Sequence, residues 1–143
     1  NGIELSRDES RFFIASSGLR SVVSYSNRAP AEQLGSSETL AIVPDNLHWD
    51  RSGELITAGL IFDYEACNPY DEAGEFDLGL YASCARPYQV VTVEPDSLDS
   101  SVLAEGAANA RFSNITMGVK VDDSLWIGTF AGDRVAYREL VDE

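Results

Sequence analysis

The chain has 143 residues, of which 44% are hydrophobic, so its length and composition suit one domain with a buried core. Its 24 acidic residues against 10 Lys and Arg give a formal net charge of −14. That charge argues against binding to nucleic-acid phosphates, which depends on clustered Lys and Arg. It fits an acidic, soluble surface, a salt-rich habitat or a site for a cation. No run of about 18 or more apolar residues occurs, so no membrane span is predicted.

Residues 1–43 are predicted to form a first module of short antiparallel strands. Apolar residues such as Ile3, Leu5 and Phe13 alternate with polar ones, which is typical of half-buried strands. Helix signals are nearly absent. The predicted strands of this module span residues 1–6, 11–16 and 20–26, followed by a loop and an outermost strand at 40–43.

Residues 44–105 are predicted to form a second module, interrupted by an acidic segment at 62–78. A segment this irregular within a compact domain is usually functional or forms an interface. Its aromatic residues either cover a binding site as a lid or anchor the segment to the rest of the domain. These aromatic residues are Phe62, Tyr64, Tyr70 and Phe76. The predicted strands of this module span residues 46–50, 54–59, 89–94 and 101–105.

Residues 106–143 are predicted to form a third module. Its predicted strands span residues 112–121, 125–130 and 134–140. Three units of about 40 to 45 residues, each with up to four short strands, are typical of β-propeller blades. A β-sandwich is the rival fold. It does not explain why polar residues recur at the same place in the repeat, as Asn1 and Asp45 do.

Two segments, Asn1-Gly2-Ile3-x-Leu5-Ser6-x-Asp8 and Pro44-Asp45-Asn46-Leu47-x-x-Asp50-x-x-Gly53-x-Leu55, resemble the calcium-dependent six-bladed propeller superfamily. This superfamily includes gluconolactonase, regucalcin, paraoxonase and the strictosidine synthase-like proteins. The stretch from Ser124 to Phe130, followed by Arg134 to Tyr137, is similar to the last full blade of paraoxonase-like members. The resemblance covers nearly the whole chain apart from the acidic segment, and it implies the C-terminal half of such a propeller.

The resemblance implies a calcium ion at the bottom of a central funnel, with Asn1, Asp45 and Asn46 as ligands. It also implies that Asp45 is a catalytic residue, as the candidate general base. Calcium takes six to eight hard oxygen ligands, so carboxylate and amide oxygens from several strands suit it. The remaining ligands of the family, a Glu and another Asn, come from blades upstream of this chain. Waters or another chain must therefore complete the coordination.

A calcium ion acts as a Lewis acid on a carbonyl group, so the resemblance implies a lactonase or arylesterase, that is, a hydrolase of lactones or esters. Leu60 stands where paraoxonase-like members have a histidine, which argues against paraoxonase-type activity. Thr116 lies where the third module meets the funnel and is either a substrate contact or an ordinary strand residue. A non-catalytic half-propeller with a structural calcium, and a strictosidine synthase-like protein, are the alternatives.

His48 is the single histidine of the chain, so a mechanism with two histidines or a Ser-His-Asp triad is poorly supported. It shares strand parity with Asn46 and is expected to face the same side. His48 is therefore either a catalytic or substrate-contacting group or a strand histidine near the protein interior.

Three blades do not close a six-bladed ring, and the open ends expose apolar sheet faces that favour association. The missing blades are expected to come from an N-terminal fragment of the same protein or from a second copy of this chain. The first residue is Asn1 and not Met, which predicts a trimmed or partial product.

Cys67 and Cys84 flank the acidic segment. They either form a disulfide, worth about 3 kcal/mol for a loop of roughly 15–20 residues, or are free thiols of a cytosolic protein. A disulfide indicates a periplasmic or secreted protein. The formal glycosylation sequon Asn114-Ile115-Thr116 matters only if a eukaryotic cell secretes the chain.

Overall fold

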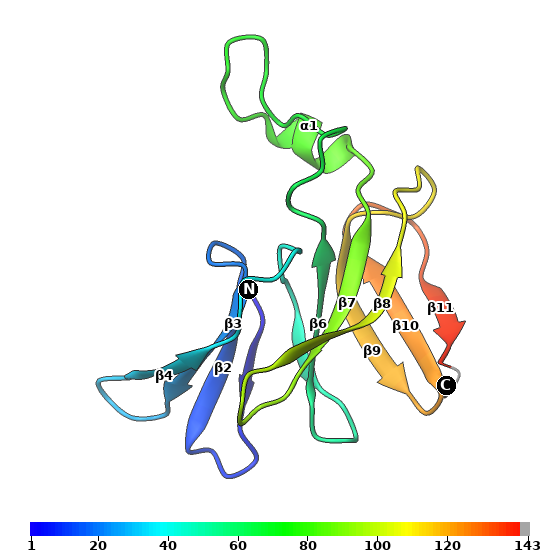
Figure 1. The fold of residues 1–143 in the computed structure, drawn as a ribbon. Coiled ribbons are helices and arrows are strands. Elements are labelled where there is room, and N and C mark those ends of the chain that lie inside the picture. Colours follow the sequence, from blue (N-terminus) through cyan, green and yellow to red (C-terminus); the bar gives the residue numbers. More distant parts are fainter. Residues whose placement is uncertain (141–143) are drawn as a thin grey trace.

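The computed structural model describes residues 1–140, and its regular secondary structure consists almost entirely of β-strands (Figure 1). The strands form three antiparallel sheets, which confirms the expected all-β architecture of successive antiparallel units. Sheet 1 contains β1 (Ile3–Leu5), β2 (Arg11–Ser16), β3 (Ser21–Ser26) and β4 (Gln33–Ser36). Sheet 2 contains β5 (Leu47–Trp49), β6 (Leu55–Leu60), β7 (Tyr88–Val93) and β8 (Ser100–Gly106). Sheet 3 contains β9 (Ile115–Val121), β10 (Ser124–Thr129) and β11 (Ala136–Glu139).

Each sheet is a simple meander, in which every strand pairs with the next strand of the chain. The first strand of each sheet therefore lies at one edge, and the three first strands are neighbours in space. Of these first strands, β1 contacts β5. The third one, β9, packs against two other strands of sheet 2, β6 and β7.

The predicted outermost strand at 40–43 is wrong. The fourth strand of sheet 1 is β4, which pairs with β3 inside the predicted loop. Leu40 and Ile42 are buried between sheets 1 and 2, and Ile42 makes only an isolated bridge to Ile61. Burying a large aliphatic side chain stabilises a fold by about 1.5–3 kcal/mol, so these residues are better placed in the core than along an exposed edge.

Two apolar cores hold the three sheets together. The first lies between sheets 1 and 2 and includes Phe13, Val22, Leu55 and Val93. Trp49 packs against it, edge-on to the Phe13 ring, and its indole Nε1 donates to the carbonyl of Leu5 at 2.7 Å. The second lies between sheets 2 and 3, and its members are Ile56, Ala58, Val90, Ala104, Ile115, Leu125 and Ile127.

The polar turn between β5 and β6 explains why the sequence motif contains Asp50 and Gly53. The buried Asp50 carboxylate accepts hydrogen bonds from the backbone N–H groups of Gly53 and Glu54 at 2.9 and 3.0 Å. Gly53 has φ of 97°, a left-handed conformation that glycine adopts without strain. Burial acts to raise the pKa of Asp50, but hydrogen bonds from Ser52, Glu54 and Gly53 outweigh it and lower the pKa. Asp50 is therefore a turn-forming residue.

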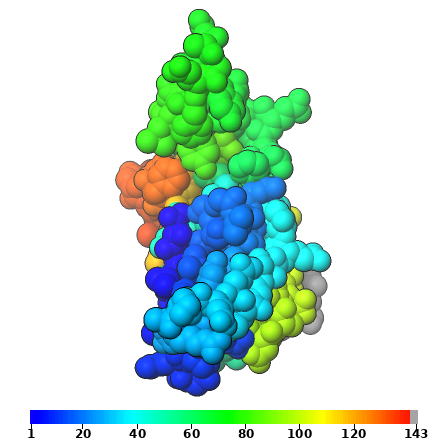
Figure 2. Space-filling view, turned by 90° about the vertical axis from the view of Figure 1, so that its left-hand side faces the viewer, coloured from blue at the N-terminus to red at the C-terminus, as the bar shows by residue number. Residues whose placement is uncertain are grey.

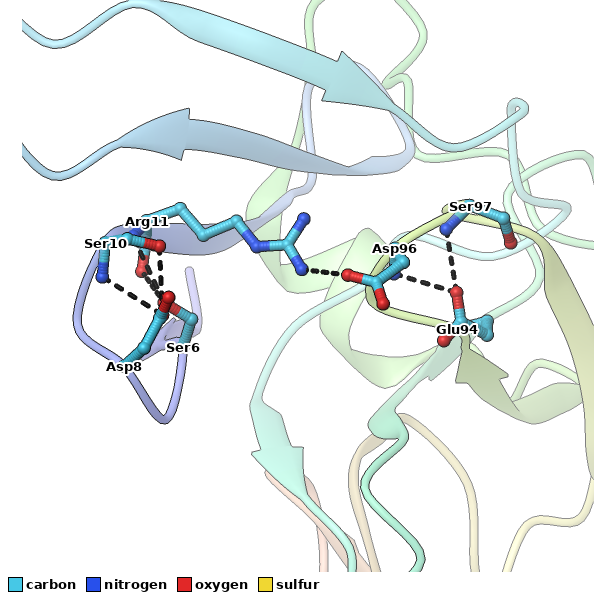
Figure 3. Close-up of polar contacts among 7 residues, drawn as sticks. All are labelled: Ser6, Asp8, Ser10, Arg11, Glu94, Asp96 and Ser97. Carbon is cyan, nitrogen blue, oxygen red and sulfur yellow. Dashed lines mark hydrogen bonds and ion pairs between the residues drawn. The ribbon is translucent and has the colours of Figure 1, made fainter.

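A polar cluster ties the turns of sheets 1 and 2 together (Figure 3). Arg11, at the start of β2, forms an ion pair with Asp96 in the β7–β8 turn. In the preceding turn, hydrogen bonds from Ser6 and then Ser10 lower the pKa of Asp8 to about 2. The Asp8 carboxylate thus organises its own turn, while Arg11 connects the two sheets.

The acidic segment forms a projection above sheet 2 (Figure 1) and extends further than predicted, to about residue 87. It contains the short helix α1 (Leu78–Ser83), which the sequence analysis did not expect. The Asp77 side chain caps this helix by accepting from the Leu80 N–H at 3.0 Å. Cys67 and Cys84 form a disulfide, with Cα atoms 5.8 Å apart, which closes the segment at its base.

None of the described residues form a helix with the length and hydrophobicity that a membrane span requires.

Apolar faces remain open at both ends of the stack of sheets. On sheet 1, which faces the viewer in Figure 2, Ile3 and Leu5 are 63% and 47% exposed, beside the stacked rings of Phe12 and Tyr25. On sheet 3, the stacked rings of Trp126 and Tyr137 are 44% and 64% exposed. We call these surfaces the sheet 1 face and the sheet 3 face.

Candidate functional site

Residues at the starts of the first strands of the three sheets meet at one cavity: Asn1 and Asp45 lie two residues before β1 and β5, and Thr116 is the second residue of β9. Asn1, Asp45 and Thr116 line a cavity of about 210 Å³. Backbone hydrogen bonds hold their strands side by side: Gly2 N–H donates to the Asp45 carbonyl at 2.9 Å, and Asn46 N–H donates to the Thr116 carbonyl at 3.1 Å. The same type of backbone hydrogen bond therefore connects sheet 1 to sheet 2 and sheet 2 to sheet 3.

The three residues occupy equivalent positions in their sheets. The residues two positions further along are Ile3, Leu47 and Gly118. They pair with Ile14, Thr57 and Ile127 on the second strands of their sheets. The anchoring bonds also correspond, since the amino group of Asn1 donates to Ala15 O at 2.8 Å and the Asp45 N–H donates to Ala58 O at 3.1 Å. The repeat predicted from the sequence thus extends to the backbone hydrogen bonds of the cavity.

A second set of equivalent residues lines the same cavity, at the ends of the second strands. These residues are Ser17, Leu60 and Phe130, each three positions after the paired residue named above. Leu60 was predicted as a site residue, whereas Ser17 and Phe130 were not. The 44-residue offset between Asn1 and Asp45 relates Ser17 to Ile61 and not to Leu60, so this offset alone could not have identified Ser17.

The Asp45 carboxylate is half-buried and accepts no hydrogen bond from any residue in 1–140. Burial raises its pKa, and the nearby positive charge of the Asn1 amino group lowers it in part. A carboxylate desolvated in this way is well suited to a cation or to a proton.

The two asparagines differ in their relation to the cavity. The Asn1 side chain donates through Nδ2 to Ser17 Oγ at 2.6 Å, and Ser17 Oγ in turn donates to the Pro44 carbonyl at 2.9 Å. The Asn46 side chain donates through Nδ2 to the Thr116 carbonyl at 3.1 Å. Asn1 lines the cavity, but Asn46 lies beside it and connects β5 to β9.

His48 is not brought to this cavity. It lies on β5, with Nδ1 3.9 Å from a carboxylate oxygen of Glu4 on β1. Its Nε2 is buried without a hydrogen-bond partner among residues 1–140. Of the predicted site residues, the structure therefore assembles Asn1, Asp45, Thr116 and Leu60, while His48 and Asn46 lie outside the lining.

The donor groups at the cavity are hard oxygen ligands. Asp45 offers a carboxylate, and the Nδ2 bond of Asn1 leaves its amide oxygen available. Asn46 retains its amide oxygen in the same way. These groups fit a calcium ion in chemistry but fall short of six to eight ligands. No three His, Cys, Asp or Glu side chains within the described part of the chain gather to hold a metal by themselves.

The acidic segment reaches over this cavity through one residue. Tyr81 of α1 lines it, and the Asn114 side chain donates through Nδ2 to the Ala82 carbonyl at 2.7 Å, which fastens the helix to the loop before β9. Phe62 instead lies under the guanidinium of Arg20, 4.4 Å from the ring centre. Phe62 thus fits the anchoring interpretation, while Tyr81 has the lid position.

Comparison with models of known protein families and with curated proteins found no match for this chain. Its functional interpretation therefore depends on its own residues and their geometry.

Proposed function

We propose that this chain forms three blades of a calcium-dependent six-bladed β-propeller hydrolase that acts on a lactone or an ester. The observation that carries the proposal is the convergence of three equivalent strand starts, at Asn1, Asp45 and Thr116, on one cavity. In a propeller, the first strands of successive blades surround a central channel, so their starts gather at one end of it.

Asp45 and Asn1 are the cavity residues that would hold calcium, and Asp45 is the only carboxylate among the lining residues within 1–140. Asn46, whose side chain bonds the Thr116 carbonyl beside the cavity, would join them only after a change of its side-chain conformation. Bound calcium supplies Lewis-acid polarisation of the substrate carbonyl. Asp45 acts as general base: a water molecule adds to the carbonyl carbon and its proton passes to Asp45. The bond to the leaving oxygen then breaks, and Asp45 returns the proton to that oxygen.

The open sheet faces support further blades. Leu5 and Trp49 occupy equivalent positions, since they pair with Phe12 and Leu55. Trp49 packs against the core between sheets, whereas Leu5 is 47% exposed. The sheet 1 face is therefore equivalent to the face of sheet 2 that packs against sheet 1. It is expected to pack against a further sheet in the same way. The neighbour comes from an N-terminal fragment of the same protein or from a second copy of the chain.

A non-catalytic half-propeller, with a purely structural calcium, is the second candidate. Leu60 favours it, because this buried aliphatic side chain lines the cavity at the position where a proton-transferring group would be useful. The cavity lining does not include His48, the one histidine of the sequence. The two candidates share the calcium site and differ in hydrolysis.

Calcium binding and hydrolysis are tested on the same preparation. The chain, stripped with a chelator, is titrated with calcium by calorimetry, and lactones and aryl esters are assayed with and without chelator. We expect calcium to bind, and we expect Asp45→Asn to weaken the calcium affinity at least tenfold. The matched control is Asp123→Asn, because the exposed Asp123 carboxylate makes no hydrogen bond within residues 1–140.

Calcium binding with hydrolysis that the chelator abolishes supports the hydrolase. Calcium binding without hydrolysis, in the chain and in its complex with the missing blades, selects the non-catalytic module. Absence of calcium binding by the chain in its complex with the missing blades, or an Asp45→Asn variant that binds as well as the unaltered chain, overturns the calcium site.

A further inference from the structure

The acidic segment contains a second cavity, which shares only Tyr81 with the lining of the one at Asp45. Its volume is about 480 Å³, within the range of small-molecule sites. Five aromatic rings line it: Phe62, Tyr64, Tyr70, Phe76 and Tyr81. Phe62, Tyr70 and Phe76 remain 49%, 53% and 56% exposed, so this cavity keeps a large apolar surface in contact with solvent.

Arg86 lines the same cavity and is only 3% exposed. Its guanidinium lies over the Tyr81 ring, 4.8 Å from the ring centre. Nη1 donates to the Phe62 carbonyl at 3.2 Å, while Nε is buried and has no hydrogen-bond partner in residues 1–140. A buried guanidinium with an unsatisfied donor is costly, and an anion that accepts from it relieves that cost.

The nearby carboxylates of the chain do not neutralise Arg86. Asp63 and Glu65 also line the cavity, but Asp63 is paired with Arg20 at 3.5 Å. Among the described residues, no carboxylate lies within ion-pair distance of Arg86. Glu65 is the internal competitor, because a change of its side-chain conformation could bring it toward the guanidinium.

We propose that this cavity binds a small aromatic carboxylate, with the carboxylate on Arg86 and the ring among the five aromatic side chains. Aromatic rings pack edge-on or offset against such a ligand, and the carboxylate accepts charge-assisted hydrogen bonds from the guanidinium. The site requires neither calcium nor the residues at Asp45, so it stands or falls independently of the proposed hydrolysis.

The probe is 2-naphthoate, titrated into the oxidised chain by calorimetry, and its neutral analogue 2-naphthalenemethanol is the matched ligand control. We expect saturable binding of 2-naphthoate and at least about tenfold weaker binding of the alcohol, since hydrogen bonds to a charged partner contribute an effect of that size. Arg86→Gln is expected to remove this preference for the anion. The exposed Arg111 provides the control variant Arg111→Gln, which keeps it.

Tyr70→Ala tests the aromatic part of the site without disturbing the core, because the Tyr70 ring is half exposed. It is expected to weaken both ligands. Glu65→Gln is expected to strengthen 2-naphthoate binding by removing the internal competitor. Circular dichroism and limited proteolysis show whether each variant keeps the folded segment.

If Arg86→Gln does not fold, the role of Arg86 is tested by comparing the binding of 2-naphthoate and of 2-naphthalenemethanol to the unaltered chain. The proposal is overturned if 2-naphthoate shows no saturable binding up to millimolar concentration. Equal binding of the acid and the alcohol, or unchanged binding to a folded Arg86→Gln variant, overturns the role of Arg86.

Discussion

Gly59 on β6 lies against the backbone that leads into the candidate site. A Cβ atom added there would stand 2.0 Å from the Val43 carbonyl oxygen, which is closer than any real contact. We therefore expect Gly59→Ala to destabilise the chain by at least about 1–3 kcal/mol, the usual effect of overpacking. Denaturant unfolding measures this change.

Gly18 provides the matched control for Gly59. A Cβ atom at Gly18 meets no atom within 4 Å, and its φ lies outside the left-handed region. Gly18→Ala should leave stability nearly unchanged, so equal stabilities of the two variants would contradict the close approach at Gly59.

Asp8 makes the stability of the chain depend on pH in the acid range. Its pKa is lowered to about 2 by hydrogen bonds from Ser6 and Ser10, so the folded state favours the ionised form. This stabilisation is fully present above the ordinary pKa near 3.8 and is lost as the pH falls toward 2. The Asp8→Asn variant should lose less stability than the unaltered chain between these values.

Urea unfolding at pH values from neutral to strongly acidic measures this difference. Asp123→Asn, which removes a carboxylate without side-chain hydrogen bonds in the described residues, should follow the unaltered chain. Parallel pH profiles for Asp8→Asn and the unaltered chain would show that the turn at Asp8 does not have this effect.

Much of the candidate site could be predicted at the residue scale, because a repeat places equivalent residues together. Asn1, Asp45 and Thr116 line one cavity as equivalent strand starts. Side-chain direction was harder to predict. Asn46 follows Asp45 directly, and neighbouring strand residues point to opposite faces, so Asn46 contacts β9 and not the cavity.

At the scale of elements, the sequence was informative about strands with internal alternation and poor at the edges. The boundaries of β2 were predicted to the residue, because all of Arg11–Ser16 pairs with β3 and its central residues also pair with β1. The strand predicted at 40–43 was wrong because its apolar residues fill the core instead. Helix α1 has six residues and no buried side chain, so it lacks the amphipathic pattern by which helices are found.

The disulfide should stabilise the acidic segment and not the sheets. Cys67 and Cys84 are 17 positions apart, so the cross-link restricts a short loop and contributes about 3 kcal/mol to its order. We expect the double variant Cys67→Ser, Cys84→Ser to be cut by protease within residues 62–87 while the sheets stay protected. Limited proteolysis with mass spectrometry identifies the cut sites.

Reduction of the unaltered chain is the comparison for this double variant, because both break the same bond. Cleavage of the sheets at the same rate as the segment would contradict an independent segment. The same experiment reports whether the Arg86 cavity needs the disulfide, since its lining includes Cys67.

For the whole molecule, the open sheet faces predict association. The sheet 1 face and the sheet 3 face expose apolar side chains of the kind that is buried between the sheets. If a second copy supplies the missing blades, the chain sediments as a dimer and Leu5→Glu converts it to a monomer. The control Leu19→Glu introduces the same charge at a 62% exposed turn residue.

Analytical ultracentrifugation measures the mass of each variant. A monomer at all concentrations would exclude a second copy as the source of the proposed further blades. If both Leu5→Glu and Leu19→Glu dissociate the dimer, the cause would be the added negative charge in general and not its position. The chain already has a net charge of −14.

The stacking order of the three sheets determines how the chain should come apart. Sheet 2 has a core on each side, whereas sheets 1 and 3 each have one. Such nearest-neighbour coupling resembles that of repeat proteins, in which opening starts at the ends and spreads inward. Amide protons of β6, all six of whose residues are buried, should therefore exchange most slowly, and β4 and β11 should lose protection first.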